Sequence, residues 1–294
     1  MNTAAMSADH GRGDSKGHRS CPGPEPDRLL RGLLTAVAAL LPHGGPARDF
    51  PPPVTLAAGD LVALHDGTAL HHDTALHHDT APSTVAAQPM IESLLADHGV
   101  QVETVTSGHA KAAQHGPDTR LVVATHRSAA RDAQRCAFAR DVPVLLPGFV
   151  AASANRVNSC LRPTPTVMLQ GADAATHAVT TPVFEMAHLP GPLRRRAPSG
   201  DERDCTHLFV RPCSYGVLTG AAEGPVDTIT ATPETQFVYL QAAATAAVDD
   251  RRITLPPGRY RIAPAERPLY HLHTHAARKQ EAHTTTAVTR ERGP

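Results

Sequence analysis

The sequence contains no tryptophan, and aromatic residues of any kind make up only 3% of its 294 residues. Few large rings are therefore available to anchor a core. No run of 18 apolar residues occurs, so no segment is expected to cross a bilayer as a helix. The 28 basic and 28 acidic residues cancel, so net charge does not support nucleic-acid binding, and only a local patch would allow it.

Cysteine is scarce and follows no CxxC pattern. The five cysteines are Cys21, Cys136, Cys160, Cys205 and Cys213. An odd number at scattered spacings favours a reducing compartment, which means the nucleus or the cytoplasm. We expect inert thiols rather than disulfides.

Proline and glycine are plentiful, with 27 and 21 residues, while apolar residues reach only 41%. This composition predicts a modest core with irregular segments attached. We expect disordered tails over residues 1–27 and 277–294. Residues 11–15 spell GRGDS, the string that integrins read, but a tail of this composition produces it easily by chance.

A helix is predicted from about residue 27 to 41, because apolar residues recur at helical spacing after Asp27. Pro42 and the three prolines 51–53 end it and form a connector, so 28–57 is a helix and connector. We expect this helix to pack on its own domain rather than on a partner.

Residues 65–80 contain near-identical hexapeptides rich in histidine and aspartate. Imidazole and carboxylate groups suit zinc, nickel or copper, which makes His71, His72, His77 and His78 candidate metal ligands. A short β-solenoid is the structural alternative. Near-perfect copies favour a third interpretation, a loop expanded by duplication.

Strand and helix patterns alternate between residues 88 and 162. Residues 90–98 read as a helix, 100–105 as a strand, and 120–125 as a continuous apolar strand of the buried kind. Ser128 is expected to cap a helix that runs to Arg140, and a further strand follows at 142–146. This alternation predicts a parallel sheet.

The segment from about 58 to 162 resembles the BRCT domain. The resemblance rests on the His98-Gly99 turn, the strand 119–125, the small-residue helix after it, the Val-Pro-Val strand and the run 147–150, which is expected to open a last helix. Phe149 stands where the family has tryptophan. The expected fold is thus a small parallel-sheet BRCT-like α/β domain followed by a β-rich domain, with disordered termini.

The resemblance implies a non-enzymatic nuclear scaffold in DNA repair, replication or chromosome maintenance, with a protein partner and no cofactor or membrane contact. The resemblance makes residues 60–64 the first strand. If the partner is phosphorylated, the resemblance places it near the loop after this strand and the start of the helix that Ser128 is expected to cap. Ala133 takes the position of the family's lysine, and it is flanked two residues away by Arg131 and Arg135. The candidate partner-binding residues are Gly67, Thr68, Ser128, Arg131 and Arg135.

The rest of the chain divides into a linker, 163–203, and a β-rich domain, 204–276. The linker is rich in Thr, Ala and Pro and ends in three arginines, 194–196, which we interpret as solvated. Residues 249–252 read as a charged turn between two strands.

Two further clusters are candidate zinc sites: the alternating His271, His273 and His275, and Cys205 and Cys213 with His207. Chance clustering and idle thiols are the simpler interpretations.

No catalytic motif such as GxSxG or HExxH occurs, so no catalytic residue is assigned. Two alternatives to the scaffold stay open. One is an α/β enzyme acting on a nucleotide or phosphorylated metabolite, with 120–162 as its binding half and the β-rich part as a lid. The other is a histidine-rich metal-binding protein.

Overall fold

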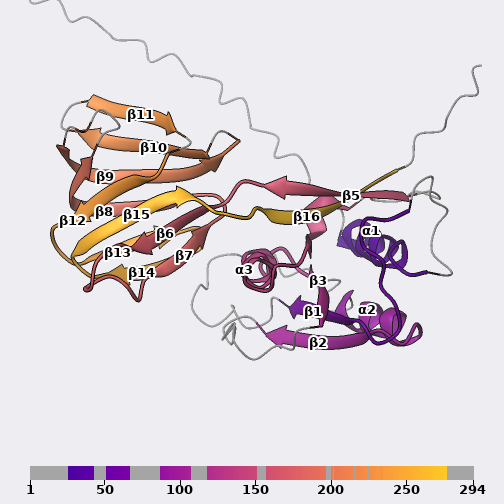
Figure 1. The fold of residues 1–294 in the computed structure, drawn as a ribbon. Coiled ribbons are helices and arrows are strands. Elements are labelled where there is room, and N and C mark those ends of the chain that lie inside the picture. The colour runs from indigo at the N-terminus through magenta and orange to yellow at the C-terminus, as the bar shows by residue number, and fades with distance from the viewer. Residues whose placement is uncertain are drawn as a thin grey trace, which may run out of the picture.

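Two β-sheets of different kinds make up the computed structural model (Figure 1). It describes residues 26–42, 51–66, 87–106, 118–150, 157–196, 200, 202–214, 216–223, 226–232 and 234–276. Both expected disordered tails lie largely outside these ranges, as does the GRGDS string. The hexapeptide repeat from Gly67 onward also lies outside them, and with it the candidate residues Thr68, His71, His72, His77 and His78.

The first layer contains the helices and the parallel strands, close to the predicted positions. Its elements are α1 (Pro26–Ala38), β1 (Leu61–Asp66), α2 (Ala87–Ala96), β2 (Gln101–Thr106), β3 (Thr119–Ala124), α3 (Ala130–Arg140), β4 (Val144–Leu145) and a 3-10 turn, Pro147–Phe149. The small sheet has the order β2-β1-β3-β4-β16-β5, and its first four strands are parallel, as predicted.

Two apolar clusters cover the two faces of this small sheet. On one face, Val62 and Leu64 of β1 pack with α1 and α2, and α1 contributes Leu33 and Val37. On the other face, Ala63 packs with the alanine stripe of α3. The alternation along β1 follows from side chains pointing to opposite faces of a strand. The predicted packing of α1 on its own domain is confirmed.

The second sheet is antiparallel and contains most of the remaining strands. They are β6 (Val167–Gly171), β7 (Thr180–Val183), β8 (Ala187–Arg196), β9 (Glu202–Cys213), β10 (Gly216–Glu223), β11 (Val226–Thr232), β12 (Gln236–Leu240), β13 (Ala244–Val248), β14 (Arg251–Leu255) and β15 (Gly258–Pro264). Their order is β11-β10-β9-β8-β12-β15-β6-β7, and β13 pairs with β8 and β14. The buried ring of Tyr260 lies in its core.

The segment 163–203, expected as a linker, instead supplies β6, β7 and β8. Val167, Leu169, Ala187, Leu189 and Leu193 are buried in the core of the large sheet. Their Thr-, Ala- and Pro-rich neighbours hid the alternation in the sequence. The three arginines 194–196 consequently lie in a strand, with Arg195 buried and its neighbours exposed.

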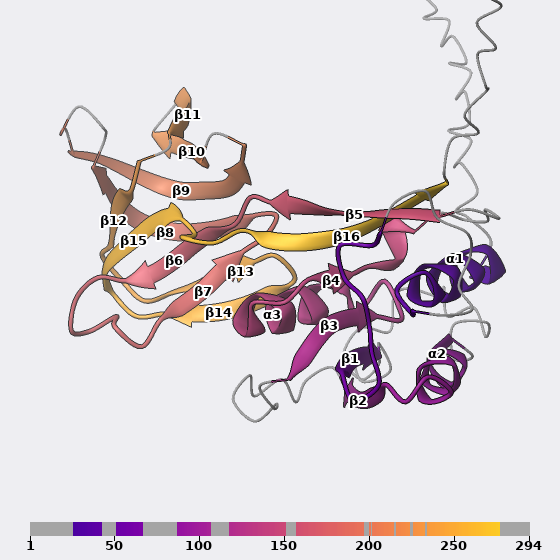
Figure 2. The ribbon, with the colours of Figure 1, turned by 45° about the vertical axis from the view of Figure 1, so that its right-hand side comes forward.

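Two strands connect the layers. β5 (Val157–Thr164) and β16 (Leu269–Ala276) pair antiparallel along their whole lengths, and β16 also pairs with β4 in parallel (Figures 1 and 2). The C-terminal strand therefore belongs to the small sheet, so the strands of region 204–276 are divided between the two sheets.

The last helix expected to open at residue 149 is not observed where the structure describes the chain. The 3-10 turn ends at Phe149, Val150 has an extended backbone, and β5 begins at Val157. The helix α3 also begins two residues after Ser128, with Ala129 as its N-terminal flanking residue and no side-chain cap.

Candidate ligand-binding cleft

The carboxyl ends of β1 and β3 are joined by Thr125. Its backbone N–H and its hydroxyl both donate to the carbonyl oxygen of His65, each at 3.0 Å. Because the strand order is 2-1-3-4, the chain runs away from β1 in both directions at this place. Ligands of open α/β sheets bind outside the carboxyl ends of strands at such a switch point.

The loop from β3 to α3 is folded around His126. The hydroxyl and the backbone N–H of Ser128 lie 2.8 and 3.2 Å from Nδ1 of this imidazole. The Ser128 hydroxyl therefore bonds to a side chain instead of capping the helix, and the predicted cap is wrong.

The arginines of α3 reach the large sheet. Arg135 donates to Asp132 at 3.0 Å and also pairs with Asp250, and Arg251 of β14 pairs with the same Asp132. Arg131 donates to Gln134 at 2.9 Å and pairs with Glu185. Figure 2 shows α3 beside β14, between the two sheets.

Three of the five residues expected to bind a partner therefore lie together at the start of α3, namely Ser128, Arg131 and Arg135. The two arginines hold the layers together instead of projecting from an open helix. Gly67 and Thr68 lie outside the described residues.

A cleft of about 310 Å³ separates α3 and the strand ends from the large sheet. Cationic and hydroxyl groups predominate among its polar lining. The lining residues are His65, Val105, Arg135, Cys136, Phe138, Ala139, Arg140, Thr180, Thr181, Pro182 and Arg251.

The three guanidiniums of the cleft differ in exposure. The side chains of Arg135 and Arg140 are 13% and 9% exposed, while that of Arg251 is 46% exposed. Arg140 pairs with Glu103 at 3.3 Å and donates to the Thr119 hydroxyl at 2.9 Å. Arg251 uses Nη2 for Asp132, and its other nitrogens bond to no other described residue. It is therefore the most available cation in the cleft.

Cys136, which lines the cleft, and His271, which contacts α3 through Gln134, are both uncharged at neutral pH. Burial raises the pKa of the Cys136 thiol, so this residue is a packing group rather than a thiolate nucleophile. His271 of β16 is buried, and its Nε2 lies 3.1 Å from Nε2 of Gln134. Desolvation, assisted by His273 and Arg131, lowers the pKa of His271 to about 4.

The candidate zinc sites do not form in the described part of the chain. No group of three or more His, Cys, Asp or Glu side chains is placed there to hold a metal ion. His271 and His273 stack with 6.3 Å between ring centroids, and Cys205 is buried while His207 pairs with His188 across the sheet at 3.1 Å. The four cysteines described are free thiols.

Sequence reasoning missed the half of the cleft that the large sheet supplies. Thr180 and Thr181 lie in the supposed linker, and Arg251 lies in the charged turn region after Asp249 and Asp250. The only sequence signal for this half of the cleft was the charged turn, because its charged side chains pair with those of α3 once the two layers pack together.

No helix in the described residues is long and apolar enough to cross a membrane.

The comparisons with known proteins gave structural similarities only. No protein-family model and no curated protein matches the sequence. Yeast NADH kinase in complex with NADH is similar over 75% of this chain and 85% of its own, with 10% identity and a TM-score of 0.45. An NAD kinase from Archaeoglobus fulgidus in complex with ATP is similar over 72% of this chain and 92% of its own, with 12% identity and a TM-score of 0.36. Such values assign neither a family nor an activity.

The resemblance to the BRCT domain is wrong. No family model supports it, and the two kinases named above are not described as BRCT domains. The small sheet is also completed by β16 and β5, from outside the segment 58–162 or at its end. The scaffold function, the role in DNA repair and the phosphopeptide site are withdrawn with it. The motifs misled because small-residue helices and Val-Pro-Val strands suit parallel α/β sheets in general.

Proposed function

We propose that the cleft binds a nucleotide or another phosphorylated metabolite, and that the chain is an enzyme acting on it. The observation that supports this is the placement of Arg135, Arg140 and Arg251, from both layers, around one cavity beside the strand ends. Guanidinium forks match the geometry of phosphate oxygens and stay charged at any physiological pH.

The location agrees with this chemistry. His65 and Val105 each lie one residue before the end of their strand, so the cavity reaches the carboxyl edge of the parallel sheet. Thr180 and Thr181 of β7 add hydroxyl groups from the opposite side. The α/β layer would serve as the binding half and the large sheet as its cover, where reduced access of water strengthens charge interactions.

The carboxylates around the cleft determine which arginine a bound phosphate is expected to contact first. Asp132, Asp250 and Glu103 form ion pairs with the arginines of the cleft. A bound phosphate would first engage the nitrogens of Arg251 that bond to no described residue, because these need not leave a carboxylate.

The test is thermal unfolding and calorimetry of the full chain with ATP, NAD and inorganic phosphate, and with adenosine as the phosphate-free control. A ligand at a hundred times its Kd adds about 2.7 kcal/mol of stability, so we expect a saturable rise in Tm of several degrees. Arg251→Ala and Thr181→Val should remove this rise. Arg252→Ala is the matched control, because its side chain points to the opposite side of the strand.

Two results would contradict the proposal. One is a Tm that no phosphate-bearing ligand changes at millimolar concentration. The other is an equal rise with adenosine, which would show that phosphate is not what the site recognises.

A further inference from the structure

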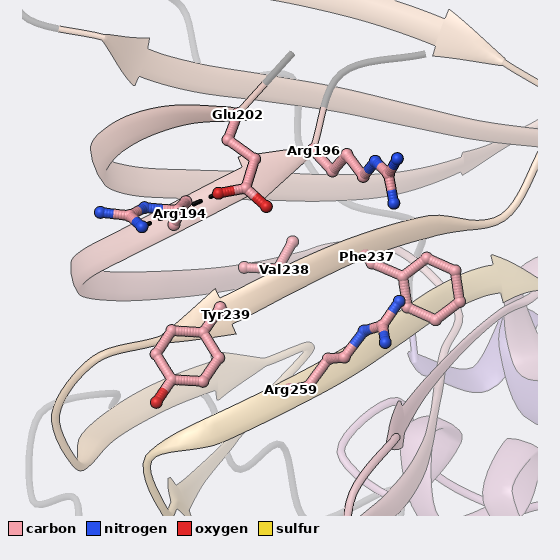
Figure 3. A pocket seen from close by; sticks show the side chains of 7 residues that line it. All are labelled: Arg194, Arg196, Glu202, Phe237, Val238, Tyr239 and Arg259. Atoms are coloured by element: carbon pink, nitrogen blue, oxygen red, sulfur yellow. Dashed lines mark ion pairs between the residues drawn. The ribbon is translucent and has the colours of Figure 1, made fainter. Parts of the chain in front are cut away.

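A groove of about 410 Å³ lies over β8, β12 and β15 of the large sheet (Figure 3), and it shares no lining residue with the cleft. Phe237 and Tyr239 project from β12 into it, on the side opposite the buried residues of that strand. Tyr239 is 49% exposed, which is unusual for a residue with a large aromatic ring. Two rings at positions i and i+2 of a strand are about 7 Å apart.

Each ring lies between two arginines of the neighbouring strands. β12 is flanked by β8 and β15, and the pairing register places arginine directly opposite both aromatic residues on both sides. Phe237 is opposite Arg196 and Arg261, and Tyr239 is opposite Arg194 and Arg259.

The arginines of this face carry more positive charge than its carboxylates neutralise. Arg194 pairs with Asp204 at 3.0 Å and with Glu202 at 3.7 Å. Among the described residues, no carboxylate lies within ion-pair distance of Arg196, Arg259 or Arg261. The Arg259 guanidinium lies 4.1 Å from the centroid of the Phe237 ring. The face is therefore a positively charged strip with a stacking platform along its middle.

We propose that this face binds single-stranded nucleic acid. Phosphates would pair with the arginines of β8 and β15, and unpaired bases would stack on Tyr239 and on the Phe237–Arg259 pair. Base stacking on aromatic side chains along a basic groove is how proteins bind single strands without reading their sequence. A duplex keeps its bases stacked on one another, so it would use the charges alone.

The charge pattern argues against a second copy of this chain as the occupant. A twofold contact places the same patch on both partners, so arginines would face arginines. The zero net charge of the chain does not oppose nucleic-acid binding here, because this face carries more arginine than carboxylate locally.

The experiment is fluorescence anisotropy of the full chain with labelled 12-nucleotide oligo(dT) and oligo(U). Three arginines of this face pair with no described carboxylate, so the slope of log K against log salt should be about −2, which is about a twentyfold loss of affinity between 50 and 200 mM salt. The double variant Arg259→Ala/Arg261→Ala should reduce the slope to about −1 or less. Tyr239→Ala should weaken binding by about fivefold or more, while Tyr239→Phe should retain it.

A variant that tightens binding distinguishes a specific effect on the binding face from general destabilisation of the sheet. Glu202→Gln removes a competing carboxylate from an exposed position, so it should tighten binding. Arg120→Ala and Tyr270→Ala are the matched controls, because both residues are exposed on the small sheet. Arg251→Ala should also leave oligonucleotide binding unchanged, which separates this face from the proposed cleft.

Three outcomes would overturn the proposal. The first is no binding of either oligonucleotide at 50 mM salt. The second is duplex DNA or heparin binding as tightly as the single strands, which would mean a response to any polyanion. The third is an affinity that Tyr239→Ala does not change.

Discussion

Arg251 of β14 donates a hydrogen bond from Nη2 to the carboxylate of Asp132 on α3, and this contact joins the two layers of the molecule. Asp132 is buried, while the Arg251 side chain is nearly half exposed. The same carboxylate also accepts a bond from Arg135 at 3.0 Å. Asp132 is thus the shared acceptor of two cations from different layers.

Removing this acceptor should cost more than removing one of its donors. We expect Asp132→Ala to lower the free energy of unfolding by about 2–3 kcal/mol, because half-buried Arg135 loses one of its two carboxylate partners and Arg251 loses its only described one. Arg251→Ala should cost about 1 kcal/mol, since its side chain is half in water. Urea denaturation measures both. Equal losses in Asp132→Ala and in the exposed control Arg252→Ala would contradict the role of Asp132.

A second prediction concerns Asp249, in the turn between β13 and β14. Its carboxylate accepts backbone N–H bonds from Phe184, Glu185 and Met186 at 3.2, 2.8 and 3.0 Å. Asp249→Ala should cost about 2–3 kcal/mol, because three amides lose their acceptor. Asp249→Asn should cost less, since asparagine keeps one acceptor oxygen and tolerates the backbone φ of 53°. If both variants unfold at the same urea concentration, the three bonds do not stabilise the turn.

The pKa of Asp173 is held below its ordinary value of 3.8, first by the backbone N–H of Arg259 at 2.6 Å and then by the Thr176 hydroxyl at 2.7 Å. A carboxyl whose pKa is lowered on folding adds stability above the unfolded pKa and loses it as the pH falls through the folded value. Stability should therefore fall below about pH 4, and Asp173→Asn should reduce that fall. The measurement is Tm between pH 2.5 and 6, and a profile that Asp173→Asn leaves unchanged would refute the prediction.

His271 should make the protein acid-sensitive over a different range. Its pKa of about 4 in the folded chain is below the ordinary 6.5, so the unfolded chain binds the proton first as the pH falls. Stability should decline from pH 6.5 and level off near pH 4, with a total loss of about 3 kcal/mol. Urea midpoints across this range should show a smaller decline for His271→Asn. The exposed His177→Asn is the control, and equal declines in both variants would exclude His271 as the cause.

The α/β alternation was predictable because its signals are local. The apolar run at Leu121, Val122 and Val123 indicates a buried parallel strand, and the alanine spacing after Ser128 indicates a helix with one small-residue face. Both elements are found near the predicted positions. Their family was mistaken because such local signals are common to many parallel α/β sheets.

The strands of 163–203 were not predictable from their residues. Thr180, Thr181 and Pro182 read as a loop in isolation, yet they form β7 because β6 supplies the pairing edge. The cleft was missed for the same reason, since Thr181 and Arg251 meet α3 only across the packed layers.

The sequence by itself determined the helices, the parallel strands and the absence of a long apolar span, since periodicity and composition act over neighbouring residues. Only the tertiary structure decided where β16 pairs, that Arg251 reaches Asp132, and that arginines lie on both sides of Phe237 and Tyr239. Each of these depends on the register between strands far apart in the chain. That register is set by the burial of whole sheet faces, which no local pattern contains.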